Sequence, residues 1–111
     1  MSAAFVSHVT ELLSALGRVE ARKMFGGYGL YCDGAFIAIV LDDTLYFKAD
    51  ARSRARFERA GLEQFAYSRM GKRARLGFYR APAEALESPD VAQQWAREAL
   101  GAALRARSKP R

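Results

Sequence analysis

The dipeptide Asp33-Gly34 lies between two apolar segments and constrains the fold of this chain more than any other sequence feature. Both central positions of a type I′ turn need positive φ, which Asp and Gly tolerate, so the dipeptide predicts a tight β-hairpin. The hairpin joins a strand around Gly27–Cys32 to the apolar run Phe36–Leu41. Asp42-Asp43 predicts a second tight turn into Thr44–Lys48. The chain is therefore expected to contain an antiparallel three-stranded meander.

Three helices and a second hairpin are predicted around this meander. Asp50 is expected to cap a short helix over Ala51–Ala60, and Ser88-Pro89 to start the last helix. Between these two helices, Gln64–Arg69 and Arg73–Arg80 predict the second hairpin. A first helix is predicted from apolar residues that recur on one helical face: Phe5, Val9, Leu12, Leu13 and Leu16.

This order of elements (helix, three strands, helix, two strands, helix) defines an α+β class. We expect a two-layer sandwich in which the helices cover one face of the antiparallel sheet. The length suits a single hydrophobic core, so we expect one domain over residues 1–104 and a basic, frayed tail over 105–111. The N-terminus has no basic region, and no segment reaches the about 20 apolar residues of a membrane span. We therefore expect a cytoplasmic protein that does not contact membranes.

Both faces of the predicted meander are apolar. The pairing across Asp33-Gly34 places Leu30 opposite Ile37 and Tyr28 opposite Ile39. A sheet with one wet face alternates apolar and polar residues instead, so the face without helices needs cover from more of this chain, a second copy or a partner. We expect a homodimer, because two-fold dimers are the commonest oligomers. The predicted partner or dimer surface consists of Tyr28, Leu30, Ile37, Ile39 and Tyr46.

The charge of the chain favours polyanionic partners. Lys and Arg number 18 against 12 Asp and Glu, a formal net charge of +6. The basic residues are scattered along the sequence, and no nucleic-acid recognition motif is visible, so a solvated basic surface is the alternative interpretation. Direct nucleic-acid binding is thus our second hypothesis, with Tyr79 as a stacking ring. The predicted nucleic-acid surface consists of Arg69, Lys72, Arg73, Arg75, Tyr79, Arg105 and Arg107.

No combination of residues predicts a catalytic, metal or cofactor site. Gly26-Gly27-Tyr28-Gly29 precedes a strand rather than a helix, so it favours a bend with close backbone contact over a phosphate-binding loop. His8 and Cys32 are the only His and Cys, too few for a structural zinc site. The acidic pair Asp42-Asp43 suits a turn, and Glu84/Glu87 suits the solvated side of a helical turn. We expect a protein that is not an enzyme and uses no cofactor; a small enzyme is the least favoured hypothesis.

The segment Arg22-Lys23-Met24-Phe25-Gly26-Gly27-Tyr28-Gly29-Leu30-Tyr31 resembles the signature of the TfoX/Sxy N-terminal domain family. The resemblance extends over Val6–Arg107, and its further matches follow in order: Leu45–Asp50, Gly71-Lys72, Phe78-Tyr79, Pro82, Trp95 and Ala99-Leu100. It implies a fold similar to secretion chaperones. It also implies a regulator of natural competence that acts with the cyclic-AMP receptor protein, without catalytic residues or cofactor.

Full-length members of that family carry a second, mainly helical domain, which has no counterpart in these 111 residues. We therefore expect a stand-alone first domain. The leading hypothesis is a non-enzymatic protein-binding or coactivator module whose partner belongs to the transcription machinery.

Overall fold

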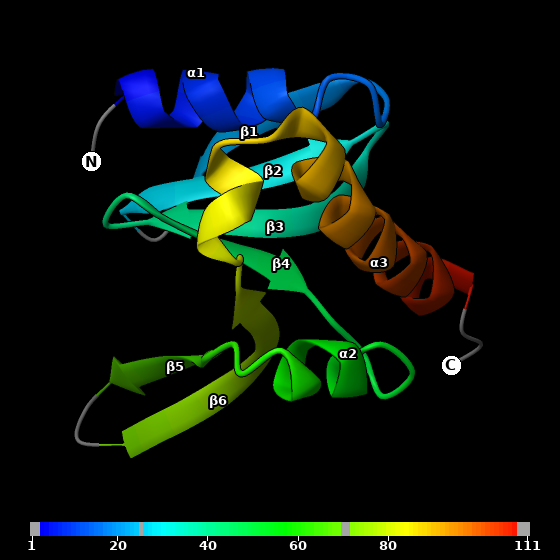
Figure 1. Cartoon of the computed structure of the whole chain (residues 1–111). Helices are drawn as coiled ribbons and strands as arrows, with labels where there is room; N and C mark the ends of the chain where they lie inside the picture. Colours follow the sequence, from blue (N-terminus) through cyan, green and yellow to red (C-terminus); the bar gives the residue numbers. More distant parts are fainter. Residues whose placement is uncertain (1–2, 25, 70–71, 109–111) are drawn as a thin grey trace.

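The computed structural model describes residues 3–24, 26–69 and 72–108, and the side chains of all of these except residues 67–69 and 72–76. Six strands form one antiparallel sheet in the order β1-β2-β3-β4-β6-β5, with the helices over one of its faces (Figure 1). The predicted α+β class and two-layer arrangement are therefore confirmed. In chain order the elements are α1 (Ala3–Leu12), β1 (Val19–Met24), β2 (Gly27–Cys32), β3 (Ala35–Leu41), β4 (Thr44–Lys48), α2 (Arg54–Arg59), β5 (Gln64–Arg69), β6 (Lys72–Arg80), the 3-10 helix η1 (Ala83–Leu86) and α3 (Pro89–Ser108).

Both tight turns of the meander are present where the sequence predicts them. Asp33 and Gly34 have φ angles of 49° and 84°, and Asp42 and Asp43 have φ angles of 51° and 54°. Positive φ at both central positions is the requirement of a type I′ turn, whose twist matches that of the flanking strands. Local turn chemistry therefore fixes the β2–β3 and β3–β4 connections.

The register of the β2–β3 pair, in contrast, differs from the prediction. A β-bulge places Leu30 opposite Ala38 and Tyr28 opposite Val40, one residue beyond the predicted partners. A bulge sets two residues of one strand against one of the other and re-aims the side chains around it. As a result Ile37 and Ala38, although consecutive in the chain, face the same side of the sheet and are both fully buried.

Strand β1 was not predicted, so the sheet has six strands rather than five. It lies at the edge of the sheet, and its four middle residues, Glu20 to Lys23, are all exposed. An edge strand without a buried face shows no alternation of apolar and polar residues. Its Glu, Ala, Arg, Lys and Met residues also favour helix over strand when considered alone.

The C-terminal helix begins as predicted but extends further. The Ser88 hydroxyl accepts a hydrogen bond from the backbone N–H of Val91 at 3.3 Å, which caps the first turn of α3. The helix continues to Ser108, so residues 105–108 are helical rather than a frayed tail. Arg105 is held in place by Asp50, a contact that the sequence does not reveal because 55 residues separate the two.

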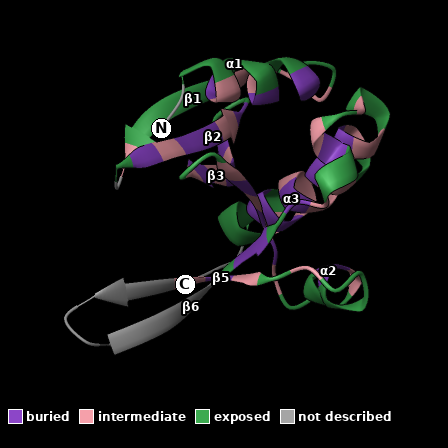
Figure 2. Ribbon diagram, turned by 60° about the vertical axis from the view of Figure 1, so that its left-hand side comes forward, coloured by how far each residue is buried: buried purple, intermediate pink, exposed green. Residues whose placement is uncertain are grey.

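The hydrophobic core fills the space between the sheet and the helices (Figure 2). Short helix α2 joins it through Phe57, whose ring stacks on Tyr79 of β6 and tilts against Trp95 of α3. All helices therefore pack on the same side of the sheet. In the described part of the chain, no helix is long and apolar enough to cross a membrane. The largest fully buried side chains are Phe47, Phe57, Leu13, Leu30, Ile37, Val9, Val40 and Cys32.

Candidate functional site

The sheet face opposite the helices carries a group of apolar side chains that is bordered by cations, and we call this group the outer face. It brings together residues from all the strands, which are up to 58 positions apart in the sequence. None of the helices in the described residues covers it, since they all pack on the other side (Figure 1). The outer face consists of Arg22, Met24, Tyr31, Phe36, Ile39, Tyr46, Lys48, Phe65, Phe78 and Arg80, and one carboxylate, Glu20, lies on it opposite Tyr31.

Three aromatic rings form one half of the outer face. Tyr31 and Phe36 lie opposite each other on β2 and β3 and stack, with ring centroids 5.0 Å apart and an interplanar angle of 22°. Phe78 of β6 tilts against Phe36 at 5.4 Å. Tyr31 and Phe36 remain partly exposed although they cover each other. Such aromatic contacts hold the rings in fixed positions.

The other half of the outer face is built around Tyr46. Tyr46 lies opposite Ile39 of β3, and both are partly exposed. Its ring contacts Phe65 of β5 edge-on, with centroids 4.8 Å apart. The group of apolar side chains thus continues across the sheet from β2 to β5.

Three cations border these rings. The Arg22 guanidinium lies over the Tyr31 ring, 4.5 Å from its centroid. The Lys48 ammonium lies 5.4 Å from the centroid of Phe78 and 5.9 Å from that of Phe36. Arg80 is exposed on β6, directly opposite Tyr46. None of the ion pairs between described residues involves these three cations, so their charges are not neutralised by carboxylates of the described chain.

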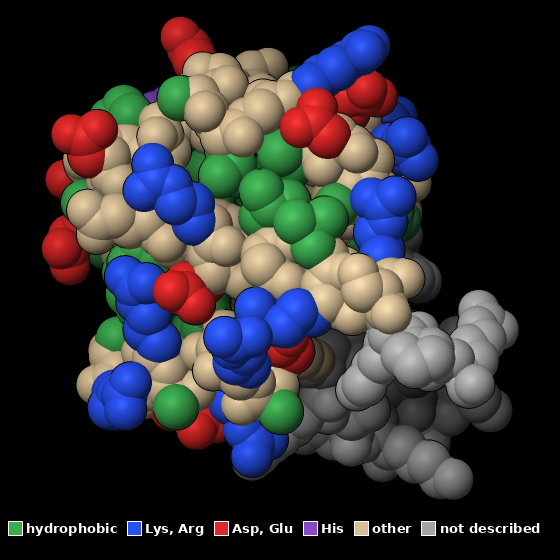
Figure 3. Space-filling view, turned by 90° about the vertical axis from the view of Figure 1, so that its right-hand side faces the viewer, with side chains coloured by type: hydrophobic (Ala, Val, Ile, Leu, Met, Phe, Trp, Pro, Cys, Tyr) green, Lys and Arg blue, Asp and Glu red, His purple; other side chains and the backbone are tan. Residues whose placement is uncertain are grey.

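The excess positive charge of the protein lies in the strands. They contain eight of the 18 Lys and Arg residues but one of the 12 acidic residues, Glu20. The strands therefore carry a formal charge of +7 and the rest of the chain −1. On the side of the molecule drawn in Figure 3, in contrast, basic and acidic side chains are interspersed. The basic residues look scattered in the sequence, but the eight that lie in strands have one acidic residue among them, so the excess charge falls in the sheet.

The glycine cluster before β2 has a structural explanation. A Cβ at Gly27 would overlap the backbone carbonyl oxygen of Val40 on β3. A Cβ at Gly29 would lie 2.6 Å from Cε of Met24 and 3.1 Å from the Phe36 ring. Gly29 therefore leaves room for the outer-face side chains, and the close-approach interpretation of the cluster is confirmed.

The predicted partner surface is divided between the two faces of the sheet. Ile39 and Tyr46 lie on the outer face, as a partner surface requires. Leu30 and Ile37 are fully buried in the core under the helices, so their assignment to a surface was wrong. Tyr28 is partly buried and packs against that same core. Leu30 and Ile37 share one face as predicted, but it is the face that the helices cover. The bulge at Ile37 exchanges the faces of the residues that follow it, which separates Ile39 from them and turns it to the outer face.

The predicted nucleic-acid surface does not gather in the described residues. Tyr79 is 3% exposed, its ring stacks on Phe57 and its hydroxyl donates to Glu58 at 2.7 Å, so it presents no open ring for a base. Arg105 is paired with Asp50, while Arg107 is exposed on α3. The side chains of four other members lie outside the described residues: Arg69, Lys72, Arg73 and Arg75.

His8 and Cys32, the residues whose types first suggest catalysis or metal binding, have structural roles in the fold. The ring Nε2–H of His8 donates to the carbonyl of Leu86 at 2.7 Å and thereby links α1 to η1. Cys32 is fully buried, and burial together with the neighbouring Asp33 carboxylate raises the pKa of its thiol. Among the described residues, no three His, Cys, Asp or Glu side chains gather into a metal site.

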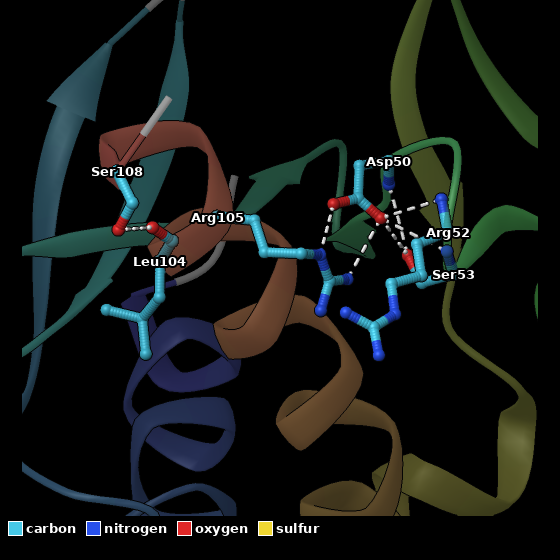
Figure 4. A network of polar contacts seen from close by, with 6 residues as sticks. All are labelled: Asp50, Arg52, Ser53, Leu104, Arg105 and Ser108. Atoms are coloured by element: carbon cyan, nitrogen blue, oxygen red, sulfur yellow. Dashed lines mark hydrogen bonds and ion pairs between the residues drawn. The ribbon is translucent and has the colours of Figure 1, made fainter. Parts of the chain in front are cut away.

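Asp50 connects α3 to the turn before α2 (Figure 4). Its Oδ2 accepts from Nε of Arg105 at 2.7 Å, and its Oδ1 accepts from Nη2 at 2.9 Å. Oδ1 also accepts from the backbone N–H groups of Arg52 and Ser53, so Asp50 caps this turn rather than the helix that follows. The hydrogen bonds from Arg105 hold the pKa of Asp50 well below its usual range, although partial burial opposes this shift.

This depressed pKa makes stability depend on pH at the acid end. The carboxylate stabilises the fold above the unfolded-state pKa of about 3.9, and the contribution is lost as the pH falls toward the lower folded-state pKa. We expect Asp50→Asn to lower the free energy of unfolding by about 1 kcal/mol at pH 7, since solvent screens this partly exposed pair. Below about pH 4, the difference from wild type should shrink. Urea unfolding from pH 7 to 2 measures it, with exposed Glu11→Gln as the control; a difference that stays constant with pH would contradict this account.

The chain matches the model of the TfoX N-terminal domain family over residues 11–103, a range that includes the whole sheet. It therefore belongs to this family, and the resemblance noted in the sequence is confirmed. It is 33% identical to DNA transformation protein TfoX1 of Aliivibrio fischeri over 78 residues, and this match covers 67% of this chain and 37% of TfoX1. It is 29% identical to Protein Sxy of Escherichia coli K12 over 98 residues, and this match covers 88% of this chain and 47% of Sxy. The chain thus spans less than half the length of these two relatives.

Proposed function

We propose that this chain is a non-enzymatic protein-binding domain that regulates competence genes from the cytoplasm and binds its partner through the outer face. The observation that carries the proposal is a sheet face that none of the described helices covers, on which half-buried rings are bordered by cations that form no ion pair with a described carboxylate. The competence part is supported by the family and by a relative named for DNA transformation. The partner is expected among proteins of the transcription machinery.

The composition of the outer face suits a protein interface. Tyr, Phe and Arg are the residues that are enriched at the centres of such interfaces, where rigid rings bury a large area at a small cost in conformational entropy. Soluble monomers rarely leave a large contiguous apolar patch on their surface. Covering Tyr31, Phe36 and Tyr46 would remove the exposed parts of these rings from water.

The charge of the outer face bears on the homodimer predicted from the sequence. Two outer faces in contact would bring Arg22, Lys48 and Arg80 of one copy near the same cations of the other, which is unfavourable. We therefore propose a partner other than a second copy for this face. Homodimerisation stays a prediction, and light scattering at high protein concentration tests it.

Direct nucleic-acid binding is the second candidate function, and the formal charge of +7 in the strands favours it. Phosphate contacts release counterions, so binding would weaken steeply as the salt concentration rises. A gel-shift series with duplex and single-stranded DNA tests this candidate. Absence of binding at low salt would remove it.

The regulatory proposal predicts a transcript phenotype in the native bacterium. Deletion of the chain and its Phe36→Asp variant should both lower transcripts of DNA-uptake genes by about tenfold, because a carboxylate within the rings destroys the apolar part of the outer face. Leu104→Asp, at an exposed site on α3, should behave as wild type. Thermal unfolding of the purified variants checks that each is folded, and Ile39→Ser offers a milder change on the same face. Unchanged transcripts after deletion would refute the regulatory proposal.

A further inference from the structure

We propose that the occupant of the outer face is an acidic polypeptide segment with interspersed apolar side chains. Its carboxylates pair with Arg22, Lys48 and Arg80, and its apolar side chains pack on the exposed ring edges of Tyr31 and Phe36. This inference rests on the proposed protein-binding function and specifies the chemistry of the partner.

Charge complementarity is the first argument for an acidic partner. Glu20 is the one acidic residue in the strand sequences, and it lies on the outer face opposite Tyr31, where it pairs with Arg18 at 3.3 Å rather than with Arg22. The cations of the outer face therefore have no internal counterion among the described residues. A carboxylate that approaches Lys48 also meets the edges of the neighbouring rings, and ring edges carry partial positive charge.

The spacing of the cations sets the length of the segment. Arg22 on β1 and Arg80 on β6 border the outer face, and Lys48 on β4 lies between them. Four inter-strand spacings of about 4.8 Å separate β1 from β6, a span of about 19 Å. An extended chain of about six residues crosses this span. Acidic residues at both ends and near the middle of such a segment would each meet a cation.

The arrangement of the rings favours a polypeptide over single-stranded nucleic acid. Bases bind to proteins by stacking on open ring faces. Tyr31 on β2 is approached by Arg22 from β1 and by Phe36 from β3, the strands on its two sides. Phe36 in turn contacts Tyr31, Phe78 and Lys48. The rings thus present edges, against which aliphatic and aromatic side chains pack but bases do not stack.

Selection from a display library of random peptides of about ten residues tests this inference on the full chain. We expect the recovered peptides to be enriched in Asp and Glu alternating with Leu, Ile or Phe. The triple variant R22E/K48E/R80E should weaken their binding by at least about tenfold. The control R52E/R59E/R97E changes the net charge equally at exposed sites on the helical side and should weaken it by less than about threefold, since screened long-range charge is the remaining effect.

Two results would overturn the inference. One is a set of recovered peptides that is not acidic, or that loses affinity equally with both triple variants. The other is a labelled oligothymidylate that binds at low salt and is displaced by R22E/K48E/R80E alone, while the recovered peptides bind elsewhere; the occupant would then be nucleic acid.

The two proposals can fail separately. Transcripts that respond to Phe36→Asp, together with a selection that yields no acidic peptides, would keep the regulatory function and reject this partner chemistry. If acidic peptides bind the outer face but deletion of the chain leaves the transcripts unchanged, the partner chemistry is kept and the regulatory function is rejected.

Discussion

Replacement of Phe57 by alanine is expected to lower the free energy of unfolding by about 3–5 kcal/mol. Phe57 is the buried residue of α2 and is 0% exposed. Its ring centroid lies 5.4 Å from that of Tyr79 and 5.0 Å from that of Trp95, so it joins the sheet and α3 at one point. A helix of six residues is not stable alone in water, so the position of α2 depends on this contact.

Guanidinium unfolding followed by far-UV circular dichroism measures this loss without relying on Trp95, whose surroundings the substitution changes. Leu104→Ala is the matched control, because Leu104 is 47% exposed on α3 and should lose less than about 0.5 kcal/mol. A loss below about 1 kcal/mol for Phe57→Ala would mean that α2 does not depend on this ring.

The parts of the fold that were predicted from the sequence are those that depend on a few adjacent residues. Asp33-Gly34 and Asp42-Asp43 define their turns because positive φ is a property of the residues themselves. The Ser88 cap acts over three residues in the same way. The alternation of helices and strands then leaves few ways to form a two-layer domain.

The parts that were not predicted depend on packing between distant segments. The bulge at Ile37 turns Ile39 to the outer face and places Ala38 and Val40 in the core. Leu30 and Ile37 are buried because the helices pack on their face of the sheet, and the strand sequences do not show which face that is. Strand β1 shows no apolar pattern because its edge position requires none. The helical extension to Ser108 is supported by Asp50, far away in the sequence.

Only part of the candidate site could be predicted from the sequence, because its residues come from distant segments. Ile39 and Tyr46 could be identified from the strand pattern, but Arg22, Lys48 and Arg80 become neighbours of one apolar group only when the sheet forms. A usable signal was nevertheless present: the predicted strands contain many basic residues and no acidic one. Charge counted by element, rather than along the chain, would have indicated a cationic sheet.

The two glycines at the start of β2 should respond very differently to alanine. At Gly27 the new methyl group would overlap the carbonyl oxygen of Val40, and a backbone atom cannot move aside without breaking the β2–β3 ladder. We expect Gly27→Ala to cost about 3 kcal/mol, at the upper end of overpacking penalties. At Gly29 the nearest atom is Cε of Met24, the end of a flexible side chain, so Gly29→Ala should cost about 1 kcal/mol or less.

Chemical unfolding of both variants, under the same conditions as wild type, measures the difference directly. Gly29→Ala also moves the Met24 side chain on the outer face while leaving the core intact, so it should alter peptide binding more than stability. Equal losses of stability would contradict the account of Gly27, because the cost would then follow from glycine itself rather than from the carbonyl of Val40. A large loss at Gly27 alone would show that the close backbone contact between Gly27 and Val40 is needed for β2 and β3, which carry Tyr31 and Phe36, to pair as they do.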